Sequence, residues 1–164
     1  MSASHETRWL DAQEQQTWRQ LSTMILRLQP VLSGQLQREF GISHFEYLIM
    51  ACLSERPESM LRMSVLATIT GSSLPRLSQA VGRLEKRKWL TRQPDEADSR
   101  YTLAVLTDAG RHELEEIAPS HVTAVRELVF DRLTRAQARQ LGAISQRVLD
   151  GLPPDDSWPS ATLL

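Results

Sequence analysis

Cysteine is scarce in this sequence, and long apolar runs are missing. Cys52 is the one cysteine among 164 residues, so the chain cannot form an intramolecular disulfide or a multi-cysteine metal cage. No run of about eighteen apolar residues occurs, and the first residues lack a basic-then-apolar leader. We therefore expect a cytoplasmic protein with no signal peptide, no membrane span and no membrane partner.

Motifs of the common enzyme classes are also missing. The sequence has no Gly-rich phosphate loop, no G-x-S-x-G elbow and no H-E-x-x-H helix. Its histidines form no pair at metal-ligand spacing: His5, His44, His112 and His121. We expect no catalysis, no cofactor and no bound metal.

Charge is unevenly distributed along the chain, although the net charge is only −1. Between residues 62 and 101, eight Lys/Arg stand against four Asp/Glu, a net charge of +4, while the remaining residues carry −5. The content of 41% hydrophobic and 24% charged residues is that of one globular domain. A basic segment on an acidic body favours contact with DNA phosphates in one orientation.

The basic segment has the pattern of two helices joined by a tight turn. We expect a short helix capped by Ser64, a break at Gly71, and a longer helix capped by Ser72 or Ser73. The apolar residues of the longer helix recur at steps of three and four, so they form one stripe that faces a core: Leu74, Leu77, Val81 and Leu84. This spacing predicts a helix-turn-helix, whose second helix enters the major groove of DNA.

The other face of the longer helix carries side chains that suit DNA. Arg76 and Gln79 match the edges of guanine and adenine. Phosphates are the expected partners of Ser72, Ser73 and Arg83. An ordinary solvated helix face has a similar composition, but the segment that follows favours DNA.

A β-hairpin is predicted directly after this helix. Leu90–Gln93 and Tyr101–Leu106 form its strands, and Pro94–Arg100 forms a Pro/Asp-rich tip. The second strand alternates larger side chains with smaller ones, as a half-buried strand does: Tyr101, Leu103 and Val105. Met60–Arg62 is a candidate third strand. A hairpin after a recognition helix is the wing of a winged helix.

Six short motifs follow one another in order along this segment. They are Leu66-Ala67, Leu77-Ser78, Arg83-Leu84-Glu85, Trp89-Leu90-Thr91-Arg92, Asp98-x-Arg100 and Val105-Leu106-Thr107-x-x-Gly110. In this order they resemble the MarR (multiple-antibiotic-resistance regulator) family of bacterial transcription factors. The resemblance implies a mainly α, α+β winged-helix fold. It also implies a sequence-specific, homodimeric DNA-binding regulator, a ligand-responsive repressor of a palindromic operator.

For the wing, the resemblance adds Arg92, Asp98 and Arg100 to the expected DNA-binding residues. Arg100 reaches the minor groove or its phosphates, and Asp98 pairs with it and fixes its direction. The sequence departs from the family at two places: Ser99 stands where a second arginine is more common, and Asp95-Glu96 makes the tip acidic. Both departures lower the expected attraction between the wing and phosphates.

Amphipathic helices are predicted both before and after the basic segment in the sequence. The first covers Trp9–Gln37, with a bend at Pro30. Capping boxes at Ser43–Glu46 and Thr134–Gln137 open two others, and Thr107 caps a further one. The first and last helices carry apolar stripes: Trp18, Leu21, Ile25, Leu28, Leu32 and Leu36, then Ala138, Leu141, Ile144, Val148 and Leu152.

This pattern divides the chain into a DNA-binding lobe at residues 38–106 and dimerisation helices at 1–37 and 107–152. Residues 153–164 are expected to form a disordered tail. The terminal helices have no strand to cover their stripes, so we expect them to pack against a second copy. Two recognition helices related by a two-fold axis match the half-sites of a palindrome, about 34–36 Å apart.

Several roles remain open at the junction between lobe and terminal helices. The resemblance implies a small aromatic or phenolic effector, with Trp18, His44, Tyr47 and Met50 as pocket candidates; packing in the core or at the dimer interface is the alternative.

Cys52 packs in the core or senses oxidants, and its apolar neighbours favour packing. The alternative to DNA binding is a winged-helix protein-interaction module.

Overall fold

The structure, a computed structural model, describes residues 7–152, so the predicted disordered tail at 153–164 lies outside it. Six α-helices lie in this range: α1 (Ala12–Phe40), α2 (His44–Ser54), α3 (Met63–Ile69), α4 (Leu74–Lys86), α5 (Asp108–Leu128) and α6 (Arg135–Asp150). Three strands accompany them: β1 (Met60–Arg62), β2 (Leu90–Pro94) and β3 (Thr102–Leu106). None of these helices is both long and apolar enough to cross a bilayer.

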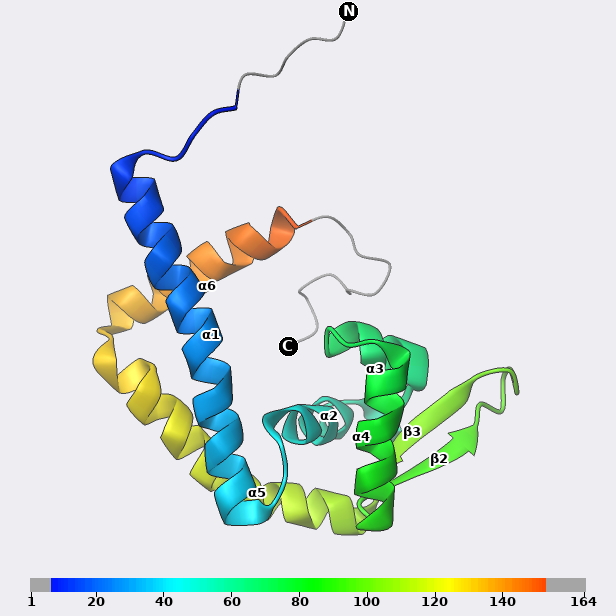
Figure 1. Cartoon of the computed structure of the whole chain (residues 1–164). Helices are drawn as coiled ribbons and strands as arrows, with labels where there is room; N and C mark the ends of the chain where they lie inside the picture. Colours follow the sequence, from blue (N-terminus) through cyan, green and yellow to red (C-terminus); the bar gives the residue numbers. More distant parts are fainter. Residues whose placement is uncertain (1–6, 153–164) are drawn as a thin grey trace, which may run out of the picture.

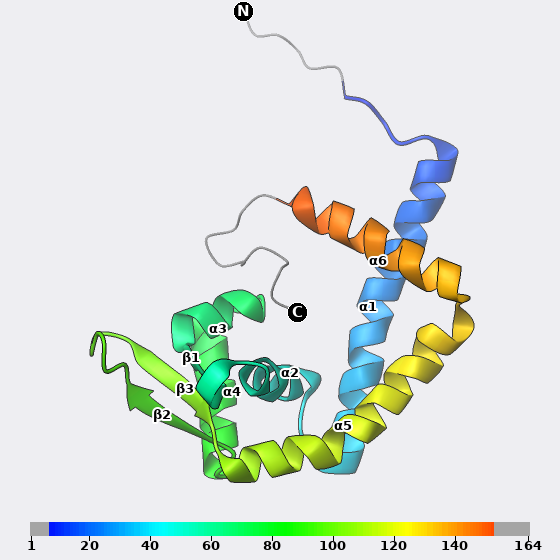
Figure 2. The same ribbon diagram turned by 180° about the vertical axis from the view of Figure 1, so that it is seen from behind.

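The elements separate into two groups (Figure 1). α2, α3, α4 and the sheet lie together as the winged lobe, whereas α1, the later part of α5 and α6 extend away from it, as Figure 2 shows from behind. α5 joins the groups, because it packs against both α1 and α2. The mainly α, α+β winged-helix prediction is confirmed.

Local capping explains where most helices begin. The predicted capping boxes at Ser43–Glu46 and Thr134–Gln137 are both present, and the Thr107 hydroxyl accepts from the Gly110 N–H. A third box at Asp11–Glu14 opens α1, which therefore begins later than predicted. α1 runs unbroken past Pro30 to Phe40.

Three details of the helix-turn-helix differ from the prediction. Ser64 does not cap α3, which already begins at Met63. Ser73 occupies the N-cap position of α4, but its side chain makes no capping hydrogen bond. Leu74 does not belong to the buried stripe, since it is 49% exposed. It has the helical phase of Val81, but the core covers α4 only from Leu77 onward.

The sheet is antiparallel, and β3 lies in the middle in the order β1-β3-β2. The predicted third strand is therefore correct and pairs with the wing. The buried face of β3 is formed by Ala104 and Leu106, not by the face that carries Tyr101, Leu103 and Val105. α2 packs against β3, where the buried face combines the small Ala104 with the larger Leu106.

The core of the winged lobe is formed by apolar side chains from every helix and strand around it. Those with almost no exposed surface include Ile49, Leu53, Leu66, Leu77, Leu84 and Leu90. Met50 and Cys52 belong to this core as well. Burial raises the pKa of the Cys52 thiol, which favours packing over oxidant sensing because the thiolate is the reactive form.

Candidate nucleic-acid interface

α4 presents one buried face and one exposed face. Leu77, Ala80, Val81 and Leu84 are buried in the lobe. Both predicted base-contacting side chains, Arg76 and Gln79, are exposed on the same helix. The other exposed residues of α4 are Leu74, Pro75, Arg83 and Lys86. The buried leucines fix the rotation of the helix, so these polar groups face outward.

Two side chains from the first turn of α2 hold the arginines of α4. The Arg76 guanidinium lies 4.6 Å from the centroid of the Phe45 ring, a cation–π contact that restrains the arginine without using its donors. The Arg83 Nε donates to Glu46 Oε1 at 2.6 Å, while the Arg83 side chain remains 55% exposed. Both arginines are therefore oriented before any ligand arrives.

Glu46 is ionised although it is buried. Burial raises the pKa of its carboxyl, but hydrogen bonds from the Ser43 N–H, from Arg83 and from the Ser43 hydroxyl together lower it below its usual value. The carboxylate is thus both the capping group of α2 and the counter-ion of Arg83.

The tip of the wing presents Arg100 with its partner Asp98, as the sequence predicts. Arg100 Nε and Nη2 donate to the two Asp98 oxygens at 2.9 and 2.6 Å, and the Arg100 side chain is 83% exposed. The same hydrogen bonds hold the pKa of Asp98 below its usual value. This fork leaves the far edge of the guanidinium open to a phosphate.

The acidic wing tip is partly neutralised within the protein. Asp95 is only 9% exposed, and its carboxylate accepts from Arg62 Nε at 2.6 Å and from the Ala97 N–H at 2.9 Å. The Arg62 guanidinium also lies 4.4 Å from the centroid of the Tyr101 ring. Asp95 therefore organises the hairpin, and of the two acidic residues at the tip only Glu96 is exposed.

Two predicted DNA-binding residues form contacts within the protein, and only the first of them is buried. Ser72 is 7% exposed, and its hydroxyl lies 3.2 Å from that of Thr70. It is therefore unavailable to a phosphate, whereas Ser73 is exposed. Arg92 Nη2 donates to the Ser78 carbonyl oxygen at 2.7 Å and lies 3.3 Å from Glu85 Oε2. It connects β2 to α4, a role that its position on a predicted strand did not reveal.

Sequence reasoning missed Arg87, which ties the end of α4 to the end of α1. Its Nη2 donates to the Gly41 carbonyl oxygen at 2.6 Å, and its guanidinium lies 4.7 Å from the centroid of the Trp89 ring. It also missed Lys86, which lies seven residues after Gln79 and so on the same exposed face. That spacing was the available signal.

The expected effector residues are not all brought together. A cavity of about 510 Å³ lies between α1, α2 and α4, and only His44 of the four candidates lines it. The Tyr47 ring stacks with the His44 ring, Met50 lies in the core, and Trp18 is 59% exposed on α1. The other lining residues are Gln29, Pro30, Ser33, Ser43, Phe45, Arg76, Gln79 and Arg83.

His44 belongs to a small buried aromatic cluster. Its Nδ1 lies 2.8 Å from Gln29 Oε1, and its ring centroid lies 5.2 Å from that of His121. Desolvation, with a smaller effect of His121, lowers the pKa of His44 to about 4. Across residues 7–152, no group of three or more His, Cys, Asp or Glu side chains is placed to hold a metal.

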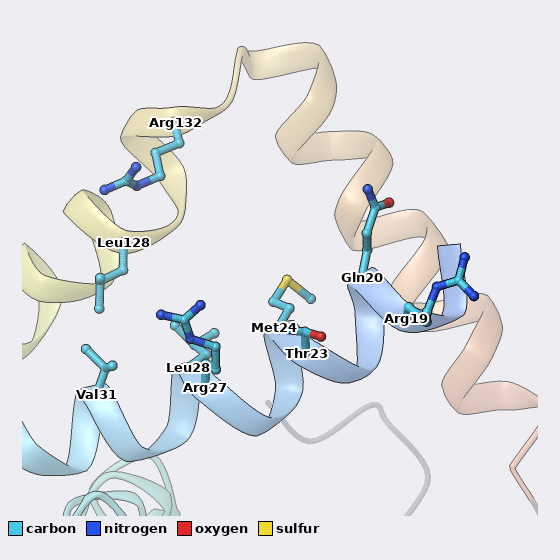
Figure 3. A pocket seen from close by; sticks show the side chains of 9 residues that line it. All are labelled: Arg19, Gln20, Thr23, Met24, Arg27, Leu28, Val31, Leu128 and Arg132. Atoms are coloured by element: carbon cyan, nitrogen blue, oxygen red, sulfur yellow. The ribbon is translucent and has the colours of Figure 1, made fainter. Parts of the chain in front are cut away.

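A second exposed surface runs along the terminal helices. α1 and the end of α5 line a groove of about 690 Å³, in which Met24, Leu28, Val31 and Leu128 alternate with arginines (Figure 3). An adjoining groove of about 280 Å³ reaches Leu141 of α6. Further apolar side chains are exposed on α1 and α6: Trp18, Ile25, Leu26, Ile144, Val148 and Leu149.

Comparison with known proteins gives one consistent family. The model of the MarR family matches residues 40–100. Sco3205, a MarR family transcriptional regulator from Streptomyces coelicolor solved in complex with DNA, is 42% identical; the likeness covers 94% of this chain and 99% of Sco3205, with a TM-score of 0.88. AbsC, a MarR family transcriptional regulator from the same organism, is 35% identical over 88% of this chain and 97% of AbsC, with a TM-score of 0.81.

A curated relative is more distant. The transcriptional repressor MprA of Escherichia coli K12 is 26% identical over 112 residues, or 68% of this chain. The aligned part spans 63% of the length of MprA.

Proposed function

Since the chain belongs to the MarR family of transcriptional regulators, we propose that it binds double-stranded DNA as a homodimer and represses transcription from a palindromic operator. α4 enters the major groove, where Arg76 and Gln79 contact base edges. Ser73 and Arg83 bind phosphates and set the register, and Arg100 extends the contact from the wing. The role is regulatory and not catalytic, and its place is the cytoplasm, where chromosomal DNA lies.

The exposed polar face of α4 is the observation that carries this proposal. It places arginine and glutamine outward on a helix whose other face is fixed by buried leucines. The likeness to Sco3205 along nearly the whole chain supports DNA as the ligand. A protein-interaction module is the weaker alternative, since its contact face would be apolar or acidic.

The terminal helices supply the second half of the proposal. Their exposed apolar stripes and grooves need a partner, because exposed apolar patches of this extent are unusual on a monomer. A second copy offers the same surface in a two-fold arrangement and doubles the recognition helices.

The cavity between α1, α2 and α4 is our proposed place for a small aromatic or phenolic effector. Its walls include Gln29 of α1, His44 of α2 and Arg76 of the recognition helix, so an occupant contacts both groups of elements. Such an effector weakens DNA binding only by the difference in its affinity for the two conformations.

Titration of duplexes selected from bacterial genomic fragments tests the function. Arg76→Ala is expected to weaken specific binding by about 1–3 kcal/mol and to relax the sequence preference. Arg100→Ala is expected to weaken binding to all duplexes alike and to lower the salt slope by about 0.9. Arg8→Ala, an exposed change outside the lobe, is the control. Unchanged affinity, selectivity and salt slope in both lobe variants would contradict the proposal.

A further inference from the structure

The first turn of α2 holds Arg83 by one edge only. Glu46 Oε1 accepts from Arg83 Nε at 2.6 Å, and no other hydrogen bond of the Arg83 guanidinium occurs within residues 7–152. The Arg83 side chain is 55% exposed, so its guanidinium can be reached from solvent on the exposed face of α4. One edge of the guanidinium is fixed, and the other remains available.

The carboxylate that fixes this edge is itself rigid. Glu46 is 6% exposed, and its Oε2 accepts from both the N–H and the hydroxyl of Ser43 at 2.8 Å. Glu46 therefore has little freedom to follow a moving arginine, and its position is set by the capping box of α2.

The wing uses a related arrangement, in which the carboxylate accepts from Nη2 of the arginine as well as from Nε. There a carboxylate, Asp98, engages Arg100 by the Nε edge and leaves an 83% exposed side chain at the surface. Arginine binds phosphate through a planar fork, so an anchored guanidinium loses less conformational entropy on binding than a free one.

We propose that Glu46 is a positioning residue for DNA binding, which presents the Nη groups of Arg83 to a backbone phosphate. This inference rests on the proposed DNA-binding function. It assigns an acidic side chain a favourable effect on binding to a polyanion, opposite to the effect of its charge alone. Removing the charge of Glu46 should therefore weaken binding, although the protein becomes more positive.

Glu46→Gln is the suitable variant, because glutamine retains the capping box and nearly the same shape. Glu115→Gln makes the same change of net charge at an exposed residue of α5, which is not among the proposed DNA-binding residues, and serves as the matched control. Arg83→Lys keeps the positive charge of residue 83 but removes its Nε–H and planar fork. Circular dichroism confirms that each variant is folded before binding is measured.

The measurement is a salt series of anisotropy titrations on a duplex that the wild type binds. We expect Glu46→Gln and Arg83→Lys each to weaken binding about 3- to 10-fold, and Glu46→Gln to lower the salt slope by up to about 0.9. Glu115→Gln should bind as the wild type does or slightly better. In an Arg83→Gln background, Glu46→Gln should have no further effect on binding.

The outcomes separate this inference from the function on which it rests. A wild type that binds no duplex overturns both the DNA-binding function and the role of Glu46. A wild type that binds, with Glu46→Gln binding equally well or better, overturns the role of Glu46 alone. So does a Glu46→Gln loss that persists undiminished in the Arg83→Gln background.

Discussion

The winged lobe and the terminal helices use the same helical spacing of apolar residues for opposite purposes. In α4, Leu77 and Val81 lie four residues apart, and both are completely buried within the lobe. In α6, Ile144 and Val148 recur in the same way, but 61% and 53% of their surfaces are exposed. A periodic stripe therefore shows that a helix has a packing face, and it does not show whether the partner belongs to the same chain.

This difference assigns different energetics to the two regions. Burial within the lobe stabilises a single copy, so its contribution is independent of protein concentration. Burial of the terminal stripes against a second copy stabilises by mass action and depends on concentration. The following changes test this division, beginning with the largest expected effect.

Leu77→Ala should be the most damaging change. Leu77 has no exposed surface, and its truncation leaves a cavity that costs about 2–5 kcal/mol. Urea unfolding should show this loss at every protein concentration. Ile144→Ala is the matched change in a terminal helix, and its cost should shrink as the protein is diluted into monomers. Equal, concentration-independent losses for both variants would contradict the division.

Gly110→Ala should be the next most damaging change, because it strains the joint between the regions. A Cβ at Gly110 would overlap the carbonyl oxygen of Trp89, whereas one at Gly142 of α6 would meet nothing within 4 Å. We expect Gly110→Ala to cost about 1–3 kcal/mol, measured by thermal or urea unfolding. Gly142→Ala should be neutral or stabilising, by up to about 1 kcal/mol. A harmless Gly110→Ala would show that the joint is not tightly packed.

Ile144→Asp should break the assembly and spare the lobe. A carboxylate in an apolar interface must be desolvated. The dimer dissociation constant should therefore rise at least tenfold, which corresponds to a loss of about 1.4 kcal/mol in the free energy of association. Sedimentation velocity measures the shift, and circular dichroism should show helices intact. Arg139→Asp, about 140° away around α6, should leave the dimer unchanged. An undisturbed dimer in Ile144→Asp would remove α6 from the interface.

The smallest effect is expected from pH. The pKa of His44 falls to about 4 from an ordinary value of 6.5, because burial disfavours its charged form. The unfolded chain therefore binds more protons than the folded chain between these values, and stability should decline as pH falls from about 6.5 to 4. Urea midpoints across this window measure the decline. His44→Gln should make the decline shallower, and His121, whose pKa is also lowered by burial, should account for part of what remains. An unchanged slope would assign the decline to groups other than His44.

The elements that local chemistry determines were predictable from the sequence. The capping boxes at Ser43–Glu46 and Thr134–Gln137 lie where the spacing placed them, because a cap needs only residues three apart. The hairpin and the outward direction of Arg76 were likewise predictable, since one follows from turn residues and the other from a stripe of leucines.

Features that depend on distant residues were not predictable. Leu74 fits the stripe of α4, but only the packed lobe shows that the core ends before it. The acidic tip gave no sign that Asp95 pairs with Arg62, which lies 33 positions earlier in the chain. Arg92 was placed on a strand facing DNA, although its partners Ser78 and Glu85 lie on α4. Each of these features depends on how distant parts of the chain pack together, which the spacing of residues along the sequence does not reveal.

The most direct test of the account is the number of copies bound to one duplex. Sedimentation equilibrium of the protein with a selected duplex should give two copies per duplex. Chemical footprinting of the same complex should show two protected major-groove segments about 34–36 Å apart. Ile144→Asp should lower the affinity of this complex, and Arg76→Ala should lower its sequence preference. A single copy bound with full affinity, or two copies bound without protection of the major groove, would contradict the account.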